Sequence, residues 1–233
     1  MSIFSRVKMN SKLYIVSTPI GNYNDITLRA LNILMETDFI ICEEFKEAKR
    51  FLSHFKIEKE LFSINEHNEE ESSREVLKKL KEGKSGALIS DCGTPLFSDP
   101  GKILVRMCID AGIDIVPVPG ANSLLAALVG SGFNLDKFYY AGWLSPKSEI
   151  RKKELSSLKS IRSLIVLMET PYRLKAILSD ISKIFGPKTE TVLAFELTLP
   201  AEKFLRGNVS EILKIAETKN LKGEFVLLVN NQK

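Results

Sequence analysis

The chain has 233 residues, of which 44% are apolar and 27% charged, and its formal net charge is +4. This length suits one large domain or two of about 110 residues, and the apolar share excludes wholesale disorder. The mild positive charge is compatible with nucleic acid but does not identify it.

Cysteine, histidine and hydropathy patterns limit the class of protein further. Three widely spaced cysteines without a Cys-x-x-Cys motif predict reduced thiols and a cytoplasmic location. Two histidines and no Cys/His cluster argue against a metal site. Residues 1–9 lack the apolar region of a signal peptide, and no apolar run approaches the roughly 18 residues of a membrane span. We therefore expect no membrane and no metal.

Short apolar segments alternate with amphipathic ones along the chain. Strands are expected at residues 13–17, 39–42, 61–63, 87–90, 114–118, 138–144, 164–169, 191–195 and 225–229. Helices are expected after a cap at Asp25 and over 75–82, 102–111, 149–158, 172–185 and 210–217. The alternation predicts an α/β fold of two α/β domains with mainly parallel or mixed sheets. The pattern breaks around 130–134, so the boundary is expected between 120 and 133, and the domains are taken as 1–120 and 121–233.

Three of the expected strand-to-helix corners are rich in Gly, Pro, Ser and Thr. They follow the strands at 13–17, 87–90 and 114–118. Open α/β sheets bind ligands at the carboxyl ends of their strands, and small residues let the main chain approach a ligand closely. Three such corners in one half of the chain favour a shared ligand site, although each alone could be an ordinary turn.

The amino-acid sequences of these corners resemble those of a known family. Residues 18–22 read Thr-Pro-Ile-Gly-Asn, and residues 90–101 read Ser-Asp-Cys-Gly-Thr-Pro-Leu-Phe-Ser-Asp-Pro-Gly. In combination they resemble signatures of the small-subunit ribosomal RNA cytidine-2′-O-methyltransferase I family, in the tetrapyrrole (precorrin/uroporphyrin) methylase superfamily. Residues 169–173, Glu-Thr-Pro-Tyr-Arg, are similar to the family's Glu-Ser-Pro-His-Arg. The likeness covers roughly residues 13–229.

The resemblance implies a two-domain homodimer that binds S-adenosylmethionine in the cleft between its domains. Its expected partner is ribosomal RNA or the small ribosomal subunit, where members methylate a cytidine ribose in the decoding region. The residues expected to bind the cofactor are Ile20, Gly93, Thr94, Phe97, Ser98, Asn122, Ser123 and Met168.

A ribose hydroxyl is a poor nucleophile at neutral pH, so a base or a cation beside it would help. Acidic residues stand at strand ends or in loops at Glu43, Asp91, Asp99, Glu169 and Glu196. We favour Glu43 and Glu169 as catalytic groups on the substrate side, together with Arg173 as a partner for phosphate or carboxylate. A helix cap or a solvated loop is the alternative role for each acidic residue, and a salt bridge is the alternative for Arg173.

Two further features bear on the substrate. A basic cluster follows Trp143 and suits either RNA or a solvated helix face; it comprises Lys147, Arg151, Lys152 and Lys153. The chain also departs from the family pattern, with Glu-Phe-Lys at 44–46 instead of Asp-Thr-Arg and Phe195 instead of Arg. Three alternatives therefore stay open: a tetrapyrrole or other small-molecule methylase, a protein methylase like the diphthine-forming relatives, and a catalytically silent paralogue that binds cofactor and ribosome.

Overall fold

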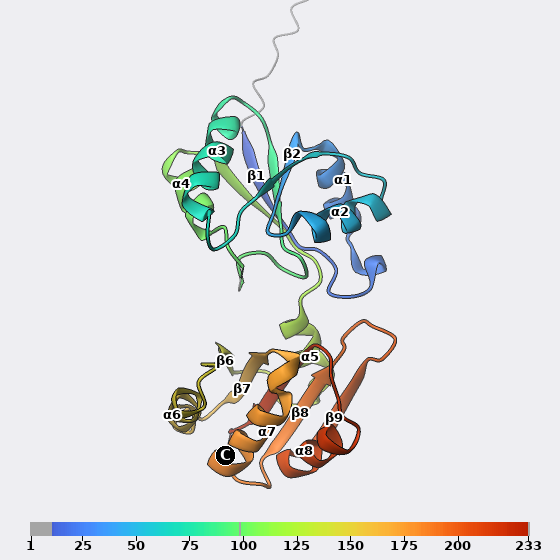
Figure 1. The fold of residues 1–233 in the computed structure, drawn as a ribbon, viewed down its shortest axis with the longest axis vertical. Coiled ribbons are helices and arrows are strands. Elements are labelled where there is room, and N and C mark those ends of the chain that lie inside the picture. The colour runs from blue at the N-terminus through green and yellow to red at the C-terminus, as the bar shows by residue number, and fades with distance from the viewer. Residues whose placement is uncertain (1–10, 98, 233) are drawn as a thin grey trace, which may run out of the picture. The chain divides into compact units, whose positions relative to one another are not determined.

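The computed structural model describes residues 11–97 and 99–232. The chain divides into two compact units, Met1–Asn122 and Ser123–Lys233, each with its own sheet and helices (Figure 1). Strands and helices largely alternate in both, which confirms the expected α/β class.

The first unit contains an all-parallel sheet with strand order β3-β2-β4-β1-β5. Its strands are β1 (Lys12–Val16), β2 (Phe39–Cys42), β3 (Glu60–Ser63), β4 (Gly86–Ile89) and β5 (Asp114–Val118). Its helical segments are η1 (Tyr23–Asp25), α1 (Leu28–Glu36), α2 (Phe45–His54), α3 (Glu69–Lys81) and α4 (Lys102–Asp110). Within this unit α1 and α2 lie on one side of the strands and α3 and α4 on the other (Figure 1).

Successive side chains of β2 pack alternately into two separate hydrophobic cores. Ile40 packs in one cluster with Leu34 of α1, and Phe39 packs in the other with Leu80 of α3. Because successive residues of a strand point to opposite faces, a strand covered on both sides must be apolar throughout. This explains why β2, with the sequence Phe-Ile-Ile-Cys, is a continuous buried run.

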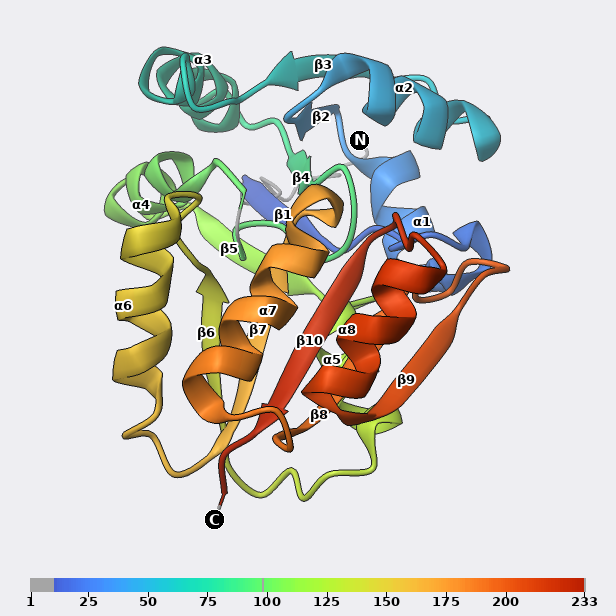
Figure 2. The same cartoon turned by 60° about the horizontal axis from the view of Figure 1, so that its bottom comes forward.

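The second unit contains a mixed sheet with strand order β6-β7-β10-β8-β9. Its strands are β6 (Phe138–Trp143), β7 (Leu164–Glu169), β8 (Glu190–Phe195), β9 (Lys203–Asn208) and β10 (Phe225–Asn230). The β6–β7 pair is parallel, and the other neighbouring pairs are antiparallel. Its helical segments are α5 (Ser123–Ser131), α6 (Ser148–Leu158), η2 (Pro171–Arg173), α7 (Leu174–Phe185) and α8 (Val209–Thr218). Figure 2 shows α6, α7 and α8 side by side over one face of this sheet.

Several elements differ from the sequence-based expectation. Helices α2 and α5 and strand β9 were not expected. The α5 sequence is almost entirely apolar, so it shows no helical period, and the edge strand β9 mixes Lys and Arg with apolar residues. The expected cap at Asp25 is wrong: Asp25 lies in η1, and the hydroxyl of Thr27 accepts the Ala30 amide at 3.1 Å.

Candidate functional site

The three loops rich in small residues meet at one edge of the first sheet. Strand β1 lies between β4 and β5, and all three are parallel, so their carboxyl ends share an edge. The Ser17 amide donates to the Val118 carbonyl at 3.2 Å, and the Thr18 amide donates to the Gly93 carbonyl at 2.8 Å. The loop after β1 is therefore hydrogen-bonded to the neighbouring strand end on one side and to the neighbouring loop on the other.

The carbonyl oxygen of Gly93 accepts several hydrogen bonds. Besides the Thr18 amide, it accepts the hydroxyls of Thr18 at 3.4 Å and Ser90 at 3.2 Å. Both hydroxyl-bearing residues are buried, at 2% and 3% exposure. Buried hydroxyls need partners, so these contacts fix the position of the Gly93 backbone.

The hydroxyl of Thr94 joins all three loops. It lies 3.2 Å from the Ser17 hydroxyl, donates to the Ala121 carbonyl at 3.4 Å, and accepts the Asn122 side-chain amide at 3.1 Å. One donor and two acceptor sites are all that a hydroxyl offers. The Thr94 hydroxyl thus connects the loops after β1, β4 and β5 by hydrogen bonds.

Two glycines allow the loops to approach this closely. Gly93 has φ +83°, and a Cβ there would lie 3.2 Å from Cγ2 of Ile20 and 3.9 Å from the Ala121 carbonyl oxygen. A Cβ on Gly120 would lie 2.9 Å from Cβ of Ser17. Side chains at these positions would force the loops apart, so the edge presents bare main chain.

The remaining expected cofactor residues are spread over the two units. Ile20, Gly93, Thr94 and Asn122 are brought together in the first unit, and Phe97, in the same loop as Gly93, is 42% exposed. Ser98 lies outside the described residues. Ser123 opens α5 and Met168 lies on β7, both in the second unit. The Tyr140 hydroxyl lies 3.2 Å from Sδ of Met168.

Acidic side chains gather beside this edge. Burial raises the pKa of Glu43, which follows β2, and the charges of Asp91, Asp99, Glu44 and Glu66 raise it further. The pKa of Asp91 and that of Asp99 are also raised, mainly by burial. The Ser63 hydroxyl donates to the Glu43 carbonyl at 2.8 Å and so fixes the backbone there. Within residues 11–97 and 99–232, no group of three His, Cys, Asp or Glu side chains is arranged to hold a metal ion.

Glu169 and Arg173 form a pair at the end of β7. Glu169 is only 2% exposed; its Oε1 accepts the Thr170 amide at 2.7 Å and Nε of Arg173 at 2.6 Å, and it also pairs with Nη2 of Arg173. Its Oε2 is buried and has no hydrogen-bond partner among the described residues. In this conformation the carboxylate holds the guanidinium of Arg173. The Arg173 side chain is 24% exposed.

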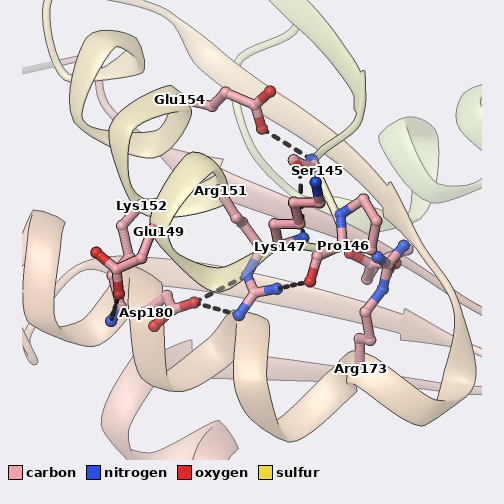
Figure 3. A network of polar contacts seen from close by, with 10 residues as sticks. Ser145, Pro146, Lys147, Glu149, Arg151, Lys152, Glu154, Arg173 and Asp180 are labelled. Atoms are coloured by element: carbon pink, nitrogen blue, oxygen red, sulfur yellow. Dashed lines mark hydrogen bonds and ion pairs between the residues drawn. The ribbon is translucent and has the colours of Figure 1, made fainter.

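The predicted basic cluster is wrong at Arg151. Figure 3 shows its guanidinium between Asp180 and the carbonyl of Pro146: Nε and Nη2 each lie 2.8 Å from Oδ2 of Asp180, and Nη1 lies 3.3 Å from the carbonyl oxygen. The two side chains are 6% and 7% exposed, so the pair belongs to the interior. Lys152 pairs with Glu149 at 3.5 Å. Of the predicted cluster, Lys147 and Lys153 are exposed.

Two surface hollows of about 440 Å³ lie away from these residues. One is between α2 and β3, and the other is at the turn between α7 and β8. Neither includes an expected site residue. Both are separate from the edge of the first sheet where the loops after β1, β4 and β5 meet, which we call the loop edge.

Comparison with known proteins shows to which family the chain is related. The profile of the Tetrapyrrole (Corrin/Porphyrin) Methylases matches residues 12–213. The Ribosomal RNA small subunit methyltransferase I of Bacillus subtilis (strain 168) is 41% identical over 217 residues, covering 93% of this chain and 74% of the relative. The protein of the same name from Thermotoga maritima is 42% identical over 221 residues, which cover 95% of this chain and 99% of the relative.

A solved structure shares the fold at low sequence identity. The uroporphyrin-III C-methyl transferase from Thermus thermophilus, complexed with S-adenyl homocysteine, aligns with a TM-score of 0.66 and 18% identity over 94% of this chain and 97% of that one. No helix in the described part of this chain has the length and apolar character needed to span a membrane. The extent and identity of these matches show that the chain belongs to the ribosomal RNA small subunit methyltransferase I family, within the tetrapyrrole methylases.

Proposed function

We propose that this protein uses S-adenosylmethionine to methylate a cytidine ribose 2′-hydroxyl in small-subunit ribosomal RNA. The observation that carries the proposal is the convergence of three loops on Gly93 and Thr94 at the carboxyl edge of the first sheet. The names of the relatives support ribosomal RNA as the substrate. The S-adenyl homocysteine in complex with the Thermus thermophilus methylase supports the identity of the donor.

The loop edge fits a donor of this kind. Gly93 and Gly120 carry no side chain of their own, which lets an amino-acid moiety and an adenine edge approach the main chain of these loops closely. The carboxyl groups of Glu43, Asp91 and Asp99 place negative potential on the same side of the sheet, which favours a cationic sulfonium. The cofactor roles of Ile20, Gly93, Thr94, Phe97, Ser98, Asn122, Ser123 and Met168 all stay predictions.

When bound, the donor supplies an electrophilic methyl group that already carries its leaving group. The protein then has to position the hydroxyl, keep water out and remove one proton. We assign the proton to a carboxylate oxygen of Glu43, because the raised pKa of this carboxyl makes it a stronger base than an ordinary glutamate. A base in this role typically contributes about a hundredfold or more to the rate.

For Glu169 we propose a different role from the one first expected, whereas Arg173 keeps its expected role. Because the Glu169 carboxylate is buried and bonded to Arg173, we propose that it positions the guanidinium rather than accepts a proton. Arg173 remains the proposed partner of a substrate phosphate, which a planar guanidinium binds well.

Two measurements test the proposal. Calorimetry should show S-adenosylmethionine binding, and no binding would remove every methylase assignment. Tritiated methyl transfer should then be compared among undermethylated small subunits, naked ribosomal RNA and uroporphyrinogen. Transfer to subunits or RNA is expected; transfer to uroporphyrinogen alone would support a tetrapyrrole methylase. Binding without transfer to any of the three would support a silent paralogue.

The homodimer stays a prediction of the family resemblance, and the cytoplasmic location stays a prediction of the cysteine pattern. Light scattering on the purified protein tests the first, since a dimer has twice the 26.2 kDa mass of the chain. Cell fractionation tests the second.

A further inference from the structure

Two exposed aromatic residues stand at one edge of the second sheet. Strands β6 and β7 are parallel, and Trp143 at the end of β6 is in register with Met168 near the end of β7. Tyr172 follows β7 in the η2 turn. Trp143 is 44% exposed and Tyr172 is 95% exposed. Both rings therefore belong to the carboxyl edge of the β6–β7 pair.

The backbone that carries Tyr172 is held in place although the ring is exposed. The Arg173 amide donates to the Thr170 carbonyl at 3.0 Å, and the Leu174 amide donates to the Pro171 carbonyl. Proline at the first position of the turn restricts the backbone further. A rigidly presented aromatic loses little entropy when it binds a partner.

Two cationic residues are close in sequence to the two aromatic residues: Arg173 directly follows Tyr172, and Lys147 comes shortly after Trp143. Glu169 engages Nε and Nη2 of Arg173, and Nη1 takes no part in that contact. Lys147, at the start of α6 just after β6, is exposed. On the same stretch Oε2 of Glu154 accepts the Ser145 amide at 2.8 Å (Figure 3). Aromatic faces next to donors suited to phosphate are typical of surfaces that bind single-stranded nucleic acid.

We propose that this edge binds an unpaired segment of the RNA substrate, with Trp143 and Tyr172 stacking on bases and Arg173 and Lys147 contacting phosphates. The inference rests on the proposed function and adds the residues that hold the RNA. An unpaired strand is required because the bases of a duplex do not expose their faces to side chains.

The protein carries its own probe, since Trp143 is the single tryptophan of the chain. Titration of the full-length protein with a short single-stranded oligocytidine RNA should quench the fluorescence of Trp143 in a saturable way. Replacing Tyr172 by alanine should weaken the affinity about tenfold, whereas Tyr172→Phe keeps the ring and should stay within about twofold.

Tyr139→Ala is the matched control. Tyr139 lies on the same strand and is 44% exposed, as Trp143 is. It is in register with Ile165, whose side chain belongs to the core on the helix-covered face, whereas Trp143 is in register with Met168, so Tyr139 and Trp143 lie on opposite faces of the sheet. Its replacement should leave RNA affinity unchanged. Tyr172→Ala should also leave the melting temperature unchanged, because the side chain makes so little contact with the protein.

Two results would overturn the inference: RNA binding without quenching of Trp143, or equal affinity of wild type and Tyr172→Ala. Methyl transfer to small subunits, measured on the same samples, separates the two proposals. Wild-type transfer with normal transfer by Tyr172→Ala at limiting RNA would reject only this surface. Absence of wild-type transfer would reject the proposed function instead.

Discussion

The backbone amide of Thr18 donates to the carbonyl of Gly93 at 2.8 Å, which joins the loop after β1 to the loop after β4. Thr94 then links both loops to the one after β5. Residues far apart in the chain thus form one hydrogen-bonded edge whose main chain is fixed before a ligand arrives. Such preorganisation lowers the entropy lost on binding.

The first prediction concerns Gly93. Gly93→Ala should weaken S-adenosylmethionine binding at least tenfold and Gly93→Arg should abolish it, because a side chain would fill the point where the loops meet. Gly112→Ala is a suitable control, since Gly112 also has a positive φ, +71°, but a Cβ there would meet nothing within 4 Å. Calorimetry on the three variants checks this. Equal loss of affinity in Gly93→Ala and Gly112→Ala would mean that backbone strain alone is responsible.

The second prediction concerns the thiols. Burial raises the pKa of Cys42 to about 12 and that of Cys108 to about 11, whereas Cys92, beside Gly93, is exposed. One thiol of the three should therefore react quickly with iodoacetamide near pH 8, because the thiolate is the reactive form. S-Adenosylhomocysteine should slow that reaction, and mass spectrometry should locate it at Cys92. Rapid labelling that the ligand does not slow would place the donor elsewhere.

The third prediction links stability and activity at Glu43. A carboxyl whose pKa is raised in the folded state favours the protonated form, so its charge destabilises the fold at neutral pH. Glu43→Gln should raise the melting temperature at pH 7. The gain should shrink as the pH falls through the raised pKa towards the ordinary value of 4.5. The same variant should transfer methyl groups about a hundredfold more slowly.

Glu75→Gln serves as the control for Glu43, because Glu75 is an exposed residue of α3. It should change neither melting temperature nor activity. A Glu43→Gln variant with normal activity would remove Glu43 from the catalytic group, and the identity of the base would have to be sought at Asp91 or Asp99.

The fourth prediction concerns the interior pair of Arg151 and Asp180. Asp180→Asn should lower the free energy of unfolding by about 3 kcal/mol, because it leaves a buried guanidinium without its counter-charge. Lys153→Glu, a charge reversal at an exposed neighbour, should change it by no more than about 0.5 kcal/mol. Urea denaturation measures both. A small effect of Asp180→Asn would contradict the buried placement of Arg151.

The loop edge could be predicted from sequence because its signal is local. Small residues directly after three apolar strands indicate close backbone approach, and parallel strands bring their ends together. The hydrogen bonds of Thr94 could not be predicted in this way, since they depend on which strands are neighbours. Helix α5 was missed because an apolar helix has no polar face to reveal its period.

The same limit explains the wrong expectation for Arg151. In sequence it lies among lysines, which suggested one exposed basic surface. Its partner Asp180 lies on another helix, and only the packing of α6 against α7 brings them together. Similarly, Glu169 has the residue type of a base, but its burial and its contact with Arg173 are tertiary features.

The most direct measurement is the mapping of ribose methyl groups on small-subunit RNA from cells with and without this protein. Mass spectrometry of nuclease fragments should show the loss of one cytidine methyl when the protein is missing. Its return is expected with the wild-type or Gly112→Ala protein but not with Gly93→Arg. An unchanged methyl pattern in cells that lack the protein would contradict the central claim.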